Sequence, residues 1–234
     1  MKVFLLLLLY SFSALAELNH ETHDFSFEYG MAYHTLRGHQ KSNDSEGRLT
    51  SDQNPFWLAA YTFRLGANFG IRFFGGVHSV RFNETAYGTL KNEDQLLSQF
   101  GLELVHKITP ITKWGFFFMQ QDHPLYYAKS PTEFEVQKEE FFQGGIHWAI
   151  GQRRRIGLIW GLGMKGYLMF PGKGGNIATE SGVGGEGYAR LGWADHYGTL
   201  YQIKGIYQAT TAPNSEVTFT HEILGYCFQV SHTF

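Results

Sequence analysis

Apolar residues alternate with small or polar residues through most of the chain beyond residue 24. In the first such segment, every second position is apolar: Phe25, Phe27, Tyr29, Met31 and Tyr33. Successive side chains of a β-strand point to opposite faces, so this period predicts a strand with one apolar face and one small or polar face.

Nine further segments repeat this pattern. They cover residues 57–65, 68–78, 96–104, 114–119, 142–148, 156–165, 183–193, 201–208 and 224–234. Most of them are close to the length of about 9–11 residues that a tilted membrane-spanning strand needs. We therefore expect an all-β chain of about ten strands, with eight or twelve as the alternatives.

The connections between these segments alternate in length. Long polar connections cover 37–53, 82–94, 122–140, 170–182 and 209–217, whereas short ones lie near 66–67, 108–111, 151–154 and 194–198. Short turns at one end and long loops at the other are typical of bacterial transmembrane barrels, whose turns are periplasmic and whose loops are extracellular. The pattern predicts a single antiparallel up-and-down transmembrane barrel with both termini on the periplasmic side.

The first sixteen residues resemble a targeting segment in their pattern. Lys2 precedes an apolar run at residues 3–10, and Ala14-Leu15-Ala16 forms a small-x-small cleavage site. This order predicts a signal peptide over 1–16 and an exported barrel domain over 17–234.

Composition narrows the class further. The single cysteine excludes a disulfide scaffold, and 17% aromatic residues exclude a disordered chain. A net charge of −2 does not indicate a nucleic-acid partner. No motif predicts a metal or a cofactor.

The nature of the two faces favours a membrane protein. The apolar face is heavy in Phe, Trp and Tyr, which suit the interfacial girdles of a barrel, and the opposite face is rich in glycine with single charges of both signs. A soluble surface normally carries more Lys and Glu. A soluble lipocalin-like barrel stays open as an alternative, and such a protein should fractionate without detergent.

The end of the chain resembles the C-terminal strand of bacterial outer-membrane β-barrel proteins. The matching positions are Tyr226, Phe228, Val230 and the terminal Phe234, whereas His232 stands where an apolar residue or Tyr is more usual. The resemblance implies a Gram-negative outer-membrane location, recognition by the barrel assembly machinery, and contact with outer-membrane lipid and lipopolysaccharide.

Charged residues of both signs fall on the face expected to line the lumen. These residues are Glu28, Arg64, Arg72, Glu103, Lys165, Glu186, Arg190 and Lys204. A charge inside a narrow barrel is costly unless it is paired. We expect an ion-pair network that largely fills a polar lumen, and the alternative is the selectivity lining of a narrow solute pore.

The leading hypothesis for function is therefore a structural or surface-interaction role. The long connections 37–53 and 122–140 are the expected sites of an extracellular ligand, the latter because it carries Tyr126, Tyr127 and Phe134. An outer-membrane enzyme that modifies lipid or peptide is a further alternative. The chain offers no convincing counterpart of the Asp–Asp and Asp–His pairs of omptin-type proteases. We expect no catalytic residues, and we expect the adjacent pair Asp122-His123 to lie at a strand end in a turn.

Overall fold

The computed structural model describes residues 23–42, 44–83, 89–91, 94–130, 133–152, 156–172 and 179–234. The expected signal peptide, residues 1–16, lies outside these ranges. In the described part of the chain, no helix has the length and apolar character needed to cross a membrane.

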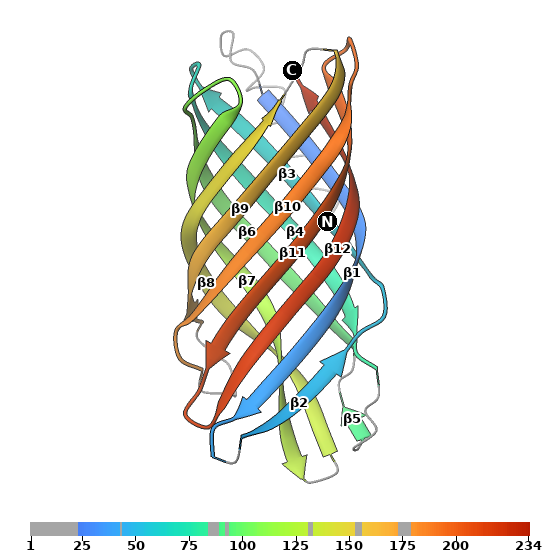
Figure 1. The fold of residues 1–234 in the computed structure, drawn as a ribbon, viewed down its shortest axis with the longest axis vertical. Helices are drawn as coiled ribbons and strands as arrows, with labels where there is room; N and C mark the ends of the chain where they lie inside the picture. The colour runs from blue at the N-terminus through green and yellow to red at the C-terminus, as the bar shows by residue number, and fades with distance from the viewer. Residues whose placement is uncertain are drawn as a thin grey trace, which may run out of the picture.

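Ten long antiparallel strands form a closed barrel (Figure 1). The strands of the wall are β1 (His23–Gln40), β3 (Asn54–Leu65), β4 (Phe69–Arg81), β6 (Asp94–Lys107), β7 (Thr112–Ser130), β8 (Glu133–Gln152), β9 (Gly157–Pro171), β10 (Gly182–Ala194), β11 (Thr199–Pro213) and β12 (Val217–Thr233). Two short strands, β2 (Ser45–Thr50) and β5 (Thr89–Lys91), pair with β1 and β8. The predicted ten-stranded up-and-down barrel is confirmed.

Pairing between the first and last strands closes the barrel. The β1–β12 ladder extends from Asp24↔Thr233 to Gln40↔Val217. At its end, the backbone N–H of Phe234 donates to the carbonyl of His23 at 2.8 Å. Every wall strand therefore has two neighbouring wall strands, which closes the sheet into a barrel.

The two ends of the barrel differ. The connections after β3, β6, β8 and β10 lie at the end where β1 begins and the chain finishes, which we call the turn end. At the opposite end, which we call the hairpin end, β7 and β8 project beyond the other strands (Figure 1).

Large apolar side chains cover the outside of the wall, as the alternation predicted. On β1, Phe27 is 42% exposed and Tyr29 is 54% exposed, whereas the intervening Glu28 is 2% exposed and faces inward. Toward the hairpin end, the outward positions become polar, as at Arg37 and Glu222, which form an ion pair. We call the outward apolar band the apolar belt; it includes Phe25, Phe27, Tyr29, Tyr33, Trp57, Phe69, Phe73, Phe100, Leu104, Phe116, Phe118, Phe142, Ile146, Leu162, Leu168, Leu191, Ile203, Leu224, Tyr226 and Phe228.

Three of the expected long loops are largely strand. Residues 37–53 contain the end of β1 and all of β2, and 209–217 contain the end of β11. The prediction of a loop over 122–140 is wrong, because β7 and β8 continue there as a paired hairpin from Asp122↔Glu140 to Ser130↔Glu133. These strand extensions could not be recognised by alternation, because their outward residues are polar. Strands beyond the apolar belt do not need an apolar outer face.

The extended β7–β8 hairpin leaves the barrel wall and leans inward. Pairing of β7 with β6 ends at Gln99↔Gln121, and pairing of β8 with β9 ends at Phe141↔Pro171. Beyond those points both faces of the hairpin are buried: Pro124 and Leu125, which point to opposite faces, are each at most 2% exposed. The hairpin therefore lies across the lumen.

One face of the hairpin packs against inward residues of β1, β2, β4 and β6. Tyr126 and Val136 contribute to this cluster, which we call the plug: Leu36, Leu49, Val80, Phe82, Leu90, Leu97, Tyr126 and Val136. The opposite face contributes Phe141 to a second cluster with Tyr167, Met169 and Ala212 of β9 and β11. Apolar side chains thus fill the lumen at the hairpin end.

Candidate functional site

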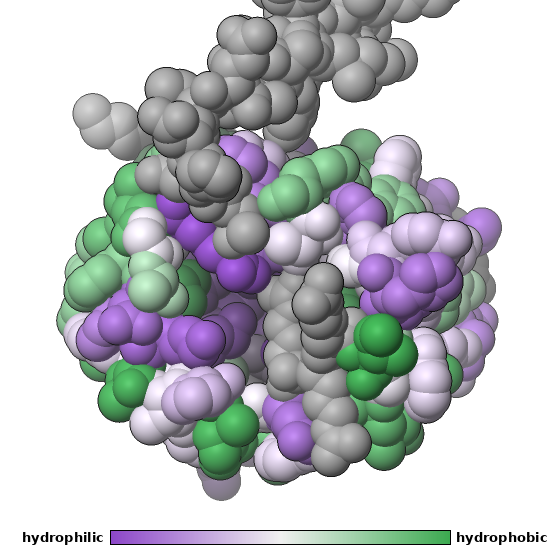
Figure 2. All heavy atoms as spheres, turned by 90° about the horizontal axis from the view of Figure 1, so that it is seen from above, coloured by the Kyte–Doolittle hydropathy of each residue, from purple (hydrophilic) through white to green (hydrophobic). Residues whose placement is uncertain are grey.

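A cavity of about 940 Å³ occupies the lumen between the plug and the turn end. Its lining extends from His78 and Ile223 in the middle of the barrel to Pro110 and Gly198 in the turns. Figure 2 looks onto the turn end and shows hydrophilic side chains around a hollow, with hydrophobic side chains on the outer ring. Among the described residues, the lumen is therefore filled at the hairpin end, by the apolar clusters described above together with buried polar residues such as Glu135 and Glu139.

Two Glu–Lys pairs lie deep in this cavity. The Lys204 Nζ donates to Glu28 Oε2 at 3.1 Å, and the Lys165 Nζ donates to both carboxylate oxygens of Glu186, at 2.9 and 3.0 Å. The Glu186–Lys165 pair joins directly opposed positions on β10 and β9, whereas Glu28 lies on β1 and Lys204 on β11. Each carboxylate is held by a cation, which offsets the cost of its burial.

A third carboxylate organises a chain of side chains across β4, β6, β8 and β10. Glu103, 2% exposed, accepts from Arg72 Nη1 at 3.3 Å and makes a short contact with His147 Nδ1. The His147 Nε2 lies 2.9 Å from the Tyr188 hydroxyl. Because an ionised Glu103 only accepts, His147 carries its proton on Nδ1 and accepts the Tyr188 O–H at Nε2. This chain fixes the position of the Tyr188 ring beside the cavity.

Arg64 lies closer to the turn end. Its Nη2 donates to Asp24 Oδ2 at 2.5 Å, and the Thr233 hydroxyl donates to the other oxygen of Asp24. This contact ties β3 to the seam between β1 and β12.

All eight charged residues predicted for the lumen face are inside the barrel, but they do not form one network. Seven of them pair as described, whereas Arg190 stands apart. Among the described residues, neither Arg190 nor Lys113 has a hydrogen-bond or ion-pair partner. Lys113 and His147 were not predicted as lumen residues, although both stand at inward positions of the alternation on β7 and β8.

Three buried histidines and the half-buried His78 mark the boundary between the cavity and the plug. The His34 Nδ1 lies 3.0 Å from His221 Nε2, and the His221 Nδ1 lies 3.4 Å from His123 Nδ1. The ring of His78 stands edge-on to that of His34, with centroids 6.0 Å apart. This cluster could not be predicted from the sequence, because its members come from four strands far apart in the chain, β1, β4, β7 and β12.

Two of these histidines lie beyond the apolar belt. Burial lowers the pKa of His123 to about 4, against an opposing contribution from the Asp122 carboxylate. Burial also lowers the pKa of His221 well below its usual range, and the nearby His34 and His123 lower it further. Both imidazoles are therefore neutral at pH 7.

The expected turn at Asp122-His123 is wrong, because both residues lie within β7 and are buried. Their side chains point to opposite faces: Asp122 accepts from the backbone N–H and hydroxyl of Ser98, whereas His123 approaches His221. Across the described ranges, no group of three His, Cys, Asp or Glu side chains is arranged to hold a metal ion.

Two aromatic residues of the expected extracellular ligand surface at 122–140 pack inside the barrel, and a ligand there stays a prediction. Tyr126 is 8% exposed within the plug, and Phe134 packs against the same cluster. These aromatic side chains bury apolar area inside the barrel instead of facing outward. The side chain of Tyr127 lies outside the described part of the structure.

The residues of the C-terminal motif lie on the outer face of β12, and Phe234 directly follows the strand. Tyr226, Phe228 and Phe234 are 49%, 51% and 70% exposed, while the intervening Cys227 and Gln229 are buried. Recognition of this motif by the assembly machinery stays a prediction.

Comparison with known proteins identifies the architecture. No protein-family model matches the sequence, and no curated protein matches it. Among solved structures, the outer membrane protease OmpT from Escherichia coli is similar with a TM-score of 0.60 and 8% identity, covering 93% of this chain and 99% of OmpT. The translocator domain of the autotransporter NalP from Neisseria meningitidis matches with a TM-score of 0.41, 11% identity, and coverage of 95% and 91%. The chain thus has the fold of bacterial outer-membrane β-barrel proteins, and at these identities the likeness concerns the fold alone.

Proposed function

We propose that this protein is a closed outer-membrane β-barrel that does not conduct solutes, with the turn end in the periplasm and the hairpin end outside the cell. The orientation follows the usual asymmetry of bacterial barrels, whose periplasmic connections are the short ones. The apolar belt provides the lipid-facing surface, and outer-membrane lipid and lipopolysaccharide are its proposed contacts.

The observation that carries this proposal is the inward β7–β8 hairpin. A pore needs a continuous polar path, but the plug places fully buried Leu36, Phe82 and Val136 across one end of the lumen. Close-packed apolar side chains leave no room for an ion with its hydration shell. The polar cavity is therefore open only at the turn end and closed at the plug.

The proposed role at the cell surface is structural or adhesive. Beyond the plug, the hairpin end presents charged side chains such as Arg81, Asp94 and Lys138, each more than half exposed. A polar, charged rim of this kind suits contact with macromolecules outside the cell.

Planar-bilayer recordings of the refolded protein test the closure. We expect no discrete conductance from the full chain. A variant that joins Asp122 to Glu140 through Asn-Gly, in place of residues 123–139, removes the hairpin at a directly opposed pair and supplies a type I′ turn. This variant should conduct, provided that its heat-modifiable gel shift shows a folded barrel.

A matched control replaces Ser215 and Glu216, which are exposed in the β11–β12 turn, with glycine and should remain silent. Discrete steps from the full chain would overturn the proposal. A folded but silent excision variant would contradict the assignment of the closure to the hairpin.

A further inference from the structure

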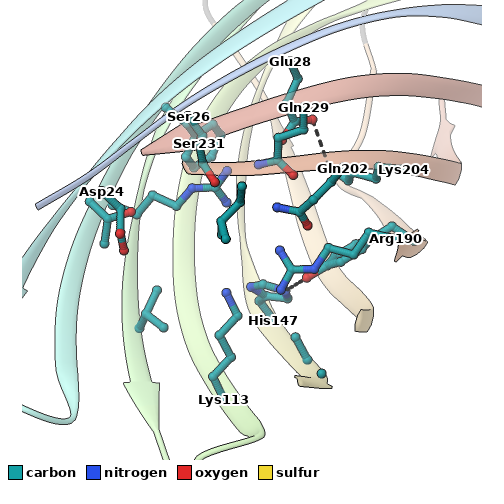
Figure 3. A pocket seen from close by; sticks show the side chains of 18 of the residues that line it. Asp24, Ser26, Glu28, Lys113, His147, Arg190, Gln202, Lys204, Gln229 and Ser231 are labelled. Atoms are coloured by element: carbon teal, nitrogen blue, oxygen red, sulfur yellow. Dashed lines mark hydrogen bonds and ion pairs between the residues drawn. The ribbon is translucent and has the colours of Figure 1, made fainter. Parts of the chain in front are cut away.

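Positive charge in the cavity exceeds what its carboxylates neutralise. Asp24, Glu28, Glu103 and Glu186 each have a cationic partner within the barrel. Three cations of the described lining remain: Lys107, which is exposed at the turn end, and Arg190 and Lys113, which reach into the same space from β10 and β7 (Figure 3).

The surroundings of Arg190 hold its guanidinium over the cavity. Arg190 opposes Gly161 on β9, where a Cβ atom would lie only 2.6 Å from Arg190 Nε. On its other side, Arg190 opposes Lys204, a second cation, in the ladder with β11. Glycine makes room for the side chain, and the like charge disfavours any closer approach to β11.

Two buried amides complete a set of donors. Gln202 on β11 is 3% exposed and Gln229 on β12 is 7% exposed, and both line the cavity. Neither amide forms a hydrogen bond with another residue in the described ranges. Figure 3 shows both side chains pointing into the space that Arg190 faces. The polar atoms of both amides are accessible from the cavity, so they can donate to a molecule bound there.

We propose that the cavity binds a small soluble oxyanion, a carboxylate or a phosphate, between Arg190, Lys113 and the amides of Gln202 and Gln229. The guanidinium provides a planar fork that matches two oxygens, Lys113 provides a point charge, and the amides donate to the remaining lone pairs. The ligand enters from the turn end, because the plug closes the other end of the lumen.

The test of this site is separate from the test of the proposed closure, because binding is measured in detergent and no conductance is recorded. In the experiment, inorganic phosphate and, separately, succinate are titrated into the refolded protein in a non-ionic detergent at constant ionic strength. The heat of binding is measured by isothermal titration calorimetry. We expect saturable binding of at least one anion and none of glycerol. The same anion should raise the urea midpoint of unfolding.

Variants assign the site. Arg190→Gln removes a charged donor, and we expect binding to weaken by about tenfold to a hundredfold. Arg37→Gln is the matched control, because Arg37 lies on the outer face of β1, paired with Glu222, and its replacement should leave the affinity unchanged.

Gln202→Leu removes one amide donor and leaves every charged residue of the cavity in place. We expect this variant to bind the anion more weakly as well. Absence of saturable binding of both anions to the wild-type protein would overturn the proposal. Equal affinities of the Arg190→Gln, Gln202→Leu and wild-type proteins, all folded by gel shift, would also overturn it.

Discussion

Replacing Tyr126 with alanine should release the β7–β8 hairpin from the plug. The Tyr126 ring packs edge-on to Phe219, with centroids 6.2 Å apart, and rests on a floor made by the opposed residues Gly38 and Gly47. A Cβ atom on Gly47 would lie 2.2 Å from the Tyr126 hydroxyl oxygen, so the fit depends on glycine there.

The size of the effect follows from the burial of this ring. A side chain only 8% exposed loses most of its contact with water, and truncating a buried aromatic residue to alanine costs about 3–5 kcal/mol. We take about 3 kcal/mol, because the site lies near the barrel mouth and has room to relax. This value raises the population of the open hairpin by roughly 150-fold.

Limited trypsin digestion reports that population. Lys138 is opposed to Pro124 in the paired hairpin, and cleavage after Lys138 requires this pairing to open. Tyr126→Ala should be cleaved on the order of a hundredfold faster than the wild type, because cleavage follows the open fraction when reclosure is fast. The barrel itself should keep its heat-modifiable gel shift.

Tyr126→Phe is the control, because the hydroxyl lies 3.5 Å from the Gly38 carbonyl, at the limit of a hydrogen bond. We expect a change below about 0.5 kcal/mol, within the low end of net hydrogen-bond contributions. If Tyr126→Ala resists trypsin as the wild type does, the plug does not hold the hairpin. If Tyr126→Phe is equally labile, the ring is not the cause.

Three further outcomes are expected. Glu103→Gln should lower the free energy of unfolding by about 3 kcal/mol in urea, because it removes the charge of the buried carboxylate that pairs with Arg72 and His147, whereas Glu222→Gln on the half-exposed outer pair should change it by less than about 1 kcal/mol. Gly47→Val should speed trypsin cleavage in the wild-type background but add little to Tyr126→Ala, since the clash is with that ring. Lowering the pH from 7 to 5 should favour the open hairpin by about 2 kcal/mol, because exposed His123 takes up a proton near pH 6.5 and buried His123 only near pH 4. The contribution of neutral His123 to the stability of the closed hairpin is therefore present above pH 6.5 and falls toward pH 4. His123→Gln should flatten this pH dependence in the trypsin assay.

The sequence predicted the wall of the barrel well, because its geometry is local. Alternation at Phe27 and Glu28 assigns each residue to a face without any knowledge of the neighbouring strand. The same reasoning placed Arg72, Glu103 and Lys165 inside, where the structure has them.

The plug could not be predicted in the same way, because it depends on where two strands part. Nothing in the period of β6 or β7 marks Gln99↔Gln121 as the last pair between them. One signal was present: near the hairpin end, the inward positions change from glycine and charged residues to Leu36, Val80 and Leu97. Large apolar residues on a lumen face require another surface to cover them.

The seam between β1 and β12 has a consequence for how this barrel is made. It joins residues as far apart as Asp24 and Thr233, 209 positions along the chain, so the last contact to form closes nearly the whole polypeptide into a loop. Until then, two long strands offer unpaired backbone groups, which invite pairing with other chains. Folding speed falls as contacts become more distant in sequence. We therefore expect the incomplete sheet to need protection from other chains until the terminal strand reaches its partner.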